Sequence, residues 1–428
     1  MLLIKNGYMI DPKSGWDGNY DILMEKGSIV RIAKRLQPPK GKCRVIDAEG
    51  LLVAPGLVDV HVHFREPGFT QKEDIGTGAA AAARGGFTSV VLMANTKPPV
   101  DNRETLEYVI KRGKETDIRV YSCANVTVGM GGRELTPMRE LATAGAVGFT
   151  DDGIPLTDEK IVREAMRNAA ALDMPISLHE EDPALIENNG VNRGRASEHF
   201  GIGGSPREAE YTMVERDLRI ALETGAGVNI QHVSARETVE LIRRAKETGH
   251  NIHAEATPHH FTLTEEATIR HGTLAKMNPP LREEADRQEI IRGLVDGTID
   301  LIATDHAPHT AEEKAKSITE APSGIIGLET ALALGITELV DGGYLTMGQL
   351  LVLMSTNPAN LYHLDAGYLA EGGPGDVILI DTTADWTPSD YASKASNTPF
   401  TGRRLRGKVV TTICRGNIVY TDRMAGRR

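Results

Sequence analysis

The chain has 428 residues, of which 40% are hydrophobic and 25% are charged, an ordinary globular composition. Its formal net charge is −11, and no cluster of Lys and Arg resembles a nucleic-acid footprint, so polyanionic partners are disfavoured. No stretch approaches the roughly 18 apolar residues of a membrane span, and the N-terminus has no signal-peptide pattern.

Both ends of the chain consist of short alternating runs that are separated by turn residues. DILMEKGSIVRIA near the start and KVVTTICRGNIVYTD near the end are examples, and such runs are typical of β-strands joined by hairpins. Because the middle of the chain has a different texture, we expect residues 1–55 and 367–428 to form one composite β-sandwich domain.

The middle of the chain, residues 56–366, alternates buried strand-like runs with longer amphipathic segments. Eight such alternations predict an α/β fold, a (β/α)₈ TIM barrel. The alternative is a doubly wound open sheet, but the first strand is followed by HVHFREPG rather than by the glycine-rich pattern of that fold. The expected strands are Leu57–His63, Phe87–Met93, Ile118–Ala124, Val147–Asp151, Pro175–His179, Val228–His232, Ile252–Glu255 and Asp300–Asp305.

Histidines and carboxylates gather at the carboxyl ends of these strands, where barrel enzymes carry their active sites. His61 and His63 end the first strand, and because strand side chains alternate, both point the same way. The other strand-end residues of this kind are Asp151 and Asp152, His179, His232, and Asp305 with His306 and His309 following it.

Four histidines and two aspartates are more ligands than one tetrahedral zinc requires. They fit two metal ions that share a bridging carboxylate and activate a bridging hydroxide. Imidazole and carboxylate ligands favour Zn²⁺, with Mn, Co or Ni as substitutes. Asp305 is placed to bind metal and also to accept a proton; the alternative is a capping or supporting carboxylate.

Polar residues on nearby loops predict a substrate site at the same end of the barrel. Arg65, Asn95, Asn278 and His309 can together recognise a carboxylate and amide edges. The polar segment 306–324 that follows the last strand is either a mobile lid or an ordinary solvated loop.

The cysteines indicate the compartment. Only Cys43, Cys123 and Cys414 are present, far apart in the sequence, and they fit neither a disulfide framework nor a Cys-rich zinc site. We therefore expect a cytoplasmic protein in a reducing environment.

Several motifs together resemble dihydroorotase, in particular the bacterial type I enzymes of the amidohydrolase superfamily. They are DVHVHFREPG, GFTDDG, KMNPPLR, IATDHAPHT and the isolated His179 and His232. The resemblance covers essentially the whole chain. It implies the reversible cyclisation of N-carbamoyl-L-aspartate to L-dihydroorotate in pyrimidine biosynthesis, with Asp305 as general acid and base.

The resemblance also implies roles for individual residues. His61, His63 and Asp305 would bind one zinc, His179 and His232 the second, and Asp152 would bridge the two. The substrate would contact His63, Arg65, Asn95, Asn278 and His309, and, on the lid side, Ser323 and Gly324.

Two departures from the family pattern occur at Ala94, where proline is commoner, and at Ser323, where many members have an aromatic residue. Neither departure changes an expected metal ligand.

Two rival functions remain open. One is a related cyclic amidase, hydantoinase- or allantoinase-like; most such enzymes use a carboxylated lysine as the metal bridge, and GAVGFTDDG has no lysine. The other is a non-catalytic scaffold for aspartate transcarbamoylase, which should have lost ligands that this chain keeps. As partners we expect a small-molecule substrate, a second copy in a homodimer, and an association with aspartate transcarbamoylase.

Overall fold

The computed structural model describes residues 1–249 and 251–422, so residues 423–428 of the expected terminal β-domain lie outside the described part. Strands from both ends of the chain build two sheets. They are β1 (Leu2–Lys5), β2 (Tyr8–Asp11), β3 (Trp16–Asn19), β4 (Asp21–Glu25), β5 (Ser28–Ala33), β6 (Arg44–Asp47), β7 (Leu52–Pro55), β15 (Val377–Trp386), β16 (Leu405–Cys414) and β17 (Asn417–Thr421).

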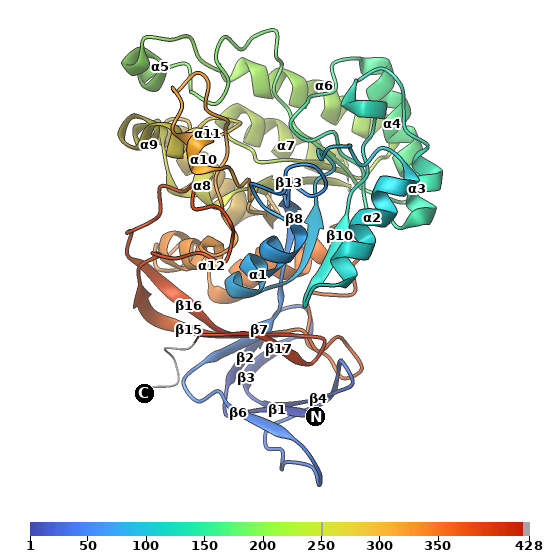
Figure 1. Cartoon of the computed structure of the whole chain (residues 1–428), viewed down its shortest axis with the longest axis vertical. Coiled ribbons are helices and arrows are strands. Elements are labelled where there is room, and N and C mark those ends of the chain that lie inside the picture. The colour runs from blue at the N-terminus through green and yellow to red at the C-terminus, as the bar shows by residue number, and fades with distance from the viewer. Residues whose placement is uncertain (250, 423–428) are drawn as a thin grey trace.

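The pairing of β7 with β15 joins the two ends of the chain. The strands are antiparallel, with Pro55 opposite Val377, and they lie inside the six-stranded sheet β17-β16-β15-β7-β2-β3. The four-stranded sheet has the order β5-β4-β1-β6. Both sheets lie at the lower end of the molecule (Figure 1), and their buried side chains, among them Ile4, Ile22 and Leu379, share one hydrophobic core.

The middle of the chain contains two parallel sheets. Their strands are β8 (Leu57–Val62), β9 (Phe87–Leu92), β10 (Arg119–Ser122), β11 (Ile176–Leu178), β12 (Val228–Ile230), β13 (Ile252–Ala256) and β14 (Leu301–Ile302). The strand orders are β10-β9-β8 and β11-β12-β13-β14. Isolated parallel bridges from Phe149 to Ala124 and to Ile176, and from Val62 to His306, link the two sheets at both edges.

The expected strand at residues 147–151 is reduced to those bridges at Phe149. The segment still hydrogen-bonds to the backbone on both sides, with Val147 N donating to Ser122 O at 3.1 Å and Phe149 N donating to Pro175 O at 3.0 Å. The other seven expected strands are present with shifted ends, and the alternation of strands with helices is the predicted α/β arrangement.

Helices follow the parallel strands and surround them (Figure 1). Asp74, the N-cap of the first helix, accepts a hydrogen bond from the Thr77 backbone, and Gly86 ends that helix at φ 90°, a left-handed value that glycine adopts freely. The helices are α1 (Ile75–Gly85), α2 (Arg103–Lys114), α3 (Met138–Ala144), α4 (Glu159–Ala171), α5 (Arg195–Phe200), α6 (Glu208–Thr224), α7 (Arg236–Thr248), α8 (Pro258–Thr262), α9 (Glu265–His271), α10 (Glu284–Asp296), α11 (Ala311–Lys314), α12 (Ala331–Leu334), α13 (Met347–Leu351) and α14 (Asn357–Leu361). Short 3₁₀ turns are η1 (Val128–Met130) and η2 (Gly272–Ala275), and π-helical turns are η3 (Gly335–Val340) and η4 (Val352–Thr356).

No helix in the described ranges combines the length and the apolar character that a membrane crossing requires.

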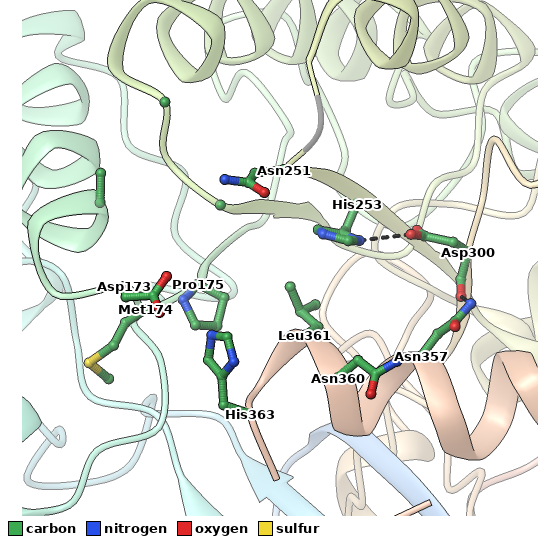
Figure 2. A pocket seen from close by; sticks show the side chains of 13 residues that line it. Asp173, Met174, Pro175, Asn251, His253, Asp300, Asn357, Asn360, Leu361 and His363 are labelled. Atoms are coloured by element: carbon green, nitrogen blue, oxygen red, sulfur yellow. Dashed lines mark hydrogen bonds and ion pairs between the residues drawn. The ribbon is translucent and has the colours of Figure 1, made fainter. Parts of the chain in front are cut away.

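A cavity of about 400 Å³ lies at the amino ends of the parallel strands. Pro175, Gly227 and Asn251 line it immediately before β11, β12 and β13. Figure 2 shows its one drawn ion pair, between His253 Nδ1 and Asp300 Oδ2 at 2.7 Å. Two of the polar side chains that line this cavity, His253 and Asp300, therefore pair with each other.

Candidate metal centre and substrate pocket

The carboxyl end of β8 presents two buried imidazoles. Every residue of β8 is buried, and the side chains of His61 and His63 lie on the same side with ring centroids 5.4 Å apart. This is the arrangement that strand alternation predicts for residues two apart.

Asp152 lies at the centre of the predicted ligands. Its Oδ1 is 3.3 Å from His61 Nε2, 3.7 Å from His179 Nδ1 and 3.6 Å from His232 Nε2, and its Oδ2 is 3.4 Å from His63 Nε2. Burial alone would raise the pKa of Asp152, but the surrounding imidazoles, His61 first, lower it well below its usual range. The carboxylate is therefore ionised and faces histidines from three strands.

Asp305 completes the cluster from the other edge. Its Oδ1 is 3.0 Å from His63 Nε2 and 3.5 Å from His61 Nε2. Burial would raise its pKa, but the charge of His61 and the hydrogen bond with His63 outweigh burial and lower it. An ionised Asp305 can accept a proton.

These side chains fit a metal ion. Two groups, His61 with His63 and Asp152, and Asp152 with His179 and His232, each bring their ligand atoms within 4.8 Å of one another. Asp152 belongs to both groups. His61 Nε2 and Asp152 Oδ1 are buried and find no hydrogen-bond partner among the described residues, so a cation there would satisfy atoms that the protein itself leaves unpaired.

Three residues of the predicted site have strained backbones. Arg65, His232 and Asp305 have φ values of 61°, 34° and 48°, in the left-handed region that non-glycine residues rarely adopt. Such strain is typical of functional sites, where it persists because the surrounding structure holds it.

The predicted ligands line a pocket of about 400 Å³ at the carboxyl ends of the strands. It is lined by all the predicted substrate contacts, which are His63, Arg65, Asn95, Asn278, His309, Ser323 and Gly324. Asn95 Oδ1 lies 3.0 Å from His63 Nδ1, and Asn278 Nδ2 lies 3.4 Å from His179 Nε2. Two of the predicted substrate contacts thus also contact histidines that are predicted metal ligands.

Cations surround His309 on the pocket wall. Burial, then the charges of Arg65 and Lys72, lower the pKa of His309 to about 2, so its imidazole is neutral. Nε2 lies 2.9 Å from Ser323 O and Nδ1 lies 3.4 Å from Lys72 Nζ. With Nε2 protonated, the ring donates to Ser323 and accepts from Lys72. Glu313 Oε1 pairs with Lys72 Nζ at 2.7 Å, so the positive charge of Arg65 is the one that favours an anionic group in this corner.

Two residues named at the strand ends do not reach the pocket. Asp151 is buried and accepts hydrogen bonds from the backbones of Val126 and Thr127. His306 is buried and its Nε2 is 3.4 Å from Glu73 Oε2. Both therefore support loops.

Sequence reasoning missed Glu255 and Lys276. Glu255 is fully buried, accepts from the His232 backbone at 3.2 Å, and pairs with His61 Nδ1, which leaves His61 Nε2 free for the cluster. Its place at the end of an expected strand was the available signal. Lys276 lines the pocket, but its Nζ donates to Ala321 O at 2.7 Å, so its role is in the loop.

Comparison with known proteins agrees with this geometry. The family model described as dihydro-orotase-like matches residues 50–238. The chain is 53% identical to the dihydroorotase of Clostridioides difficile (strain 630), covering 98% of this chain and 100% of that one. It is 52% identical to the dihydroorotase of Lactococcus lactis subsp. lactis, covering 98% and 99%.

Solved structures share the fold. L-hydantoinase (dihydropyrimidinase) from Arthrobacter aurescens superposes with a TM-score of 0.88 at 26% identity, covering 98% of this chain and 96% of that one. D-hydantoinase from Thermus sp. gives a TM-score of 0.86 at 24% identity, covering 99% and 96%.

The α/β fold and the paired His/Asp groups place the chain in the amidohydrolase superfamily, among hydrolases that bind metal. Within it, the chain belongs to the dihydroorotase family.

Proposed function

We propose that this protein is a dihydroorotase, which reversibly closes N-carbamoyl-L-aspartate to L-dihydroorotate in pyrimidine biosynthesis. Identity of 53% over nearly the full length of a dihydroorotase supports the activity. The observation that carries the proposal within this chain is the pocket itself. It joins two His/Asp groups through Asp152 and places the cationic Arg65 and the neutral His309 beside them.

The architecture that we propose is a (β/α)₈ barrel of residues 56–366 with a β-sandwich of residues 1–55 and 367–428. The bridges at Phe149 and His306 support closure of the parallel strands into a barrel. The shared core of the two terminal sheets supports the sandwich.

We propose two Zn²⁺ ions for the site. His61, His63 and Asp305 would hold one, His179 and His232 the other, and Asp152 would bridge them. When bound, such ions lower the pKa of water and polarise a carbonyl group.

The protein's own residues supply the proton transfers and the orientation. In the hydrolytic direction, Asp305 accepts a proton from the attacking water and returns it to the ring nitrogen as the carbon–nitrogen bond breaks. In the biosynthetic direction the same carboxylate takes the proton from the closing nitrogen. Its rigid placement, 3.0 Å from His63 Nε2, keeps the proton acceptor in one position.

Arg65 orients the substrate's carboxylate. Its Nε donates to Pro308 O at 3.2 Å, which fixes the guanidinium at that nitrogen, and its Nη2 lies 3.3 Å from His309 Nε2. Arg65 and His309, with Asn95, would bind the carboxylate, and Asn278 the ring edge; Ser323 and Gly324 would close the lid side.

A related cyclic amidase is the second candidate, because solved hydantoinases share the fold. The aspartate at the proposed bridging position argues against a cyclic amidase of this kind. Asp152 occupies the centre of the cluster, and Lys276, the lysine lining the pocket in the described chain, donates to a loop carbonyl instead. Lys160 is exposed on α4.

An absorbance assay of dihydroorotate hydrolysis tests the proposal, with hydantoin and allantoin as parallel substrates. We expect turnover of dihydroorotate and little of the others. Turnover of hydantoin or allantoin alone would favour the cyclic amidase. A protein that purifies without metal and turns over none of the three would be a scaffold.

We further propose that the protein works in the cytoplasm as a homodimer that associates with aspartate transcarbamoylase. The cysteines support a reducing compartment, since Cys43, Cys123 and Cys414 are all free thiols. Sedimentation of the protein alone and with that enzyme tests the two associations.

A further inference from the structure

The connection between β15 and β16, residues 387–404, leaves the terminal sheet and packs against the α/β part of the molecule. In Figure 1 this red segment rises from β15 past α12. It is anchored along its length: the Ala392 backbone donates to Glu329 Oε1 at 2.9 Å, and Lys394 Nζ donates to Thr70 O at 3.0 Å.

Asn397 carries this segment to the substrate pocket. The residue is 4% exposed. Its Nδ2 donates to Ala307 O and to Gly324 O, each at 3.1 Å, and its Oδ1 accepts from the His309 backbone at 3.1 Å. Its own carbonyl accepts from the Ile326 backbone at 3.1 Å. One side chain thus uses its amide nitrogen and its amide oxygen on two separate stretches of chain.

Those two stretches form one wall of the pocket. His309 and Gly324 both line it, and His309 Nε2 contacts Ser323 O at 2.9 Å. They are in close contact, because a Cβ placed on Gly324 would lie 2.6 Å from Ala307 Cβ. A group that fixes the spacing of these stretches also fixes the cationic corner between them.

We propose that Asn397 is a positioning residue for substrate binding: from the segment between β15 and β16 it holds His309 and Gly324 at the spacing that the substrate's carboxylate requires. This rests on the proposed dihydroorotase function. The part of the chain that follows the parallel strands therefore contributes to the site without touching the metal ligands.

The test compares three variants of the full-length protein. Asn397→Ala removes all three side-chain hydrogen bonds, and Asn397→Ser keeps a hydroxyl that serves only one partner. Tyr391→Phe is the control, because it removes one exposed hydrogen bond, to Thr401 Oγ1, on the same segment. Each is assayed for KM, kcat and metal content.

We expect the KM for dihydroorotate to rise about tenfold in Asn397→Ala and less in Asn397→Ser, with kcat changed by less than about threefold and metal content unchanged. Tyr391→Phe should match the parent. A merely structural role would lower the active fraction, which reduces apparent kcat at constant KM, and that result would overturn the proposal. Failure of both Asn397 variants to fold would overturn it as well.

Residue-resolved hydrogen exchange supplies a readout that needs no substrate. The His309 amide, which donates to Asn397 Oδ1, should exchange faster in Asn397→Ala, whereas the Ile326 amide, which donates to the Asn397 backbone, should stay protected. Unchanged exchange at His309 would overturn the proposal. If the parent protein turns over no dihydroorotate, the proposed function fails while exchange still decides the role of Asn397.

Discussion

The two ends of the parallel strands carry cavities of the same size, about 400 Å³ each, but opposite polar chemistry. At the amino end, Asp300 pairs with His253 and Lys246, and the side chains of His253 and Asp300 are 29% and 20% exposed. At the carboxyl end, the side chains of His61 and Asp152 are 0% and 4% exposed, and both have atoms without a hydrogen-bond partner in the described chain. In the described chain, these buried atoms that lack a hydrogen bond belong to the potential metal-binding groups at the carboxyl end, so this arrangement fits a cation.

The largest effect should come from the proton carrier at the carboxyl end. Asp305→Asn should keep the fold but lose turnover in both directions, because one group moves the proton each way. We expect kcat to fall on the order of 10²–10⁴-fold, measured by absorbance for hydrolysis and by product analysis for closure. Turnover close to that of the parent would remove Asp305 from the mechanism.

The next largest effect should be on metal retention. Asp152→Ala should lose first the ion held by His179 and His232, because two imidazoles alone leave it under-coordinated. We expect its affinity to fall at least about 10–100-fold, the usual cost of removing even an outer partner, as measured by metal analysis after dialysis.

Asp151→Ala is the matched control for this change, since Asp151 faces backbone amides instead of the cluster. It should lose stability but retain both ions. Two ions retained by Asp152→Ala would contradict the bridge.

The bridge also predicts how metal-free protein recovers. A carboxylate needs no carbon dioxide, whereas a carboxylated lysine does. Apo-protein that is given zinc in carbon-dioxide-depleted buffer should therefore regain activity as fully as in bicarbonate. A requirement for bicarbonate would favour a hydantoinase-like site.

A smaller effect is expected at the substrate's carboxylate. Arg65→Lys keeps the charge but loses the planar fork that binds a carboxylate through two hydrogen bonds. KM for dihydroorotate should rise about tenfold, which corresponds to roughly 1.4 kcal/mol, with a smaller change in kcat. An unchanged KM would show that Arg65 does not touch the substrate.

The smallest effect should come from the amino-end cavity and should concern stability alone. Burial would raise the pKa of Asp300, but the hydrogen bond from His253 and the charge of Lys246 lower it. Its contribution to stability is therefore present above the unfolded pKa of 3.8 and is lost as the pH falls through the lower folded value.

Asp300→Asn should accordingly reduce the free energy of unfolding by about 1 kcal/mol at neutral pH. The difference from the parent should shrink in acid, as measured by denaturant titration across pH. Turnover should stay at the parent's level, and a loss of turnover would break the contrast between the two ends.

Much of this contrast follows from sequence. Strand alternation is a local rule, so it is enough to place His61 and His63 on one face of a strand, and the dihydroorotase resemblance is confirmed by the relatives. The α/β alternation was also predictable. The prediction of a full strand at residues 147–151 was wrong, because only isolated bridges form at Phe149. The individual roles of the site residues stay predictions.

Contacts between distant segments could not be predicted. Asn397 reaches His309 and Gly324 across 88 and 73 residues, and no local periodicity encodes such a pairing. Glu255 ended an expected strand, but its role depends on the ring orientation of His61, which packing determines. Asp151 and Asp152 are adjacent and chemically identical, and only the fold directs one to backbone amides and the other to the histidines.

Anomalous diffraction from crystals of this protein soaked in zinc would show directly whether two ions share Asp152. We expect two strong peaks in the carboxyl-end pocket, one on each side of Asp152, and none between His253 and Asp300. A single peak, a peak pair that Asp152 does not bridge, or a peak at the amino-end cavity would contradict this expectation.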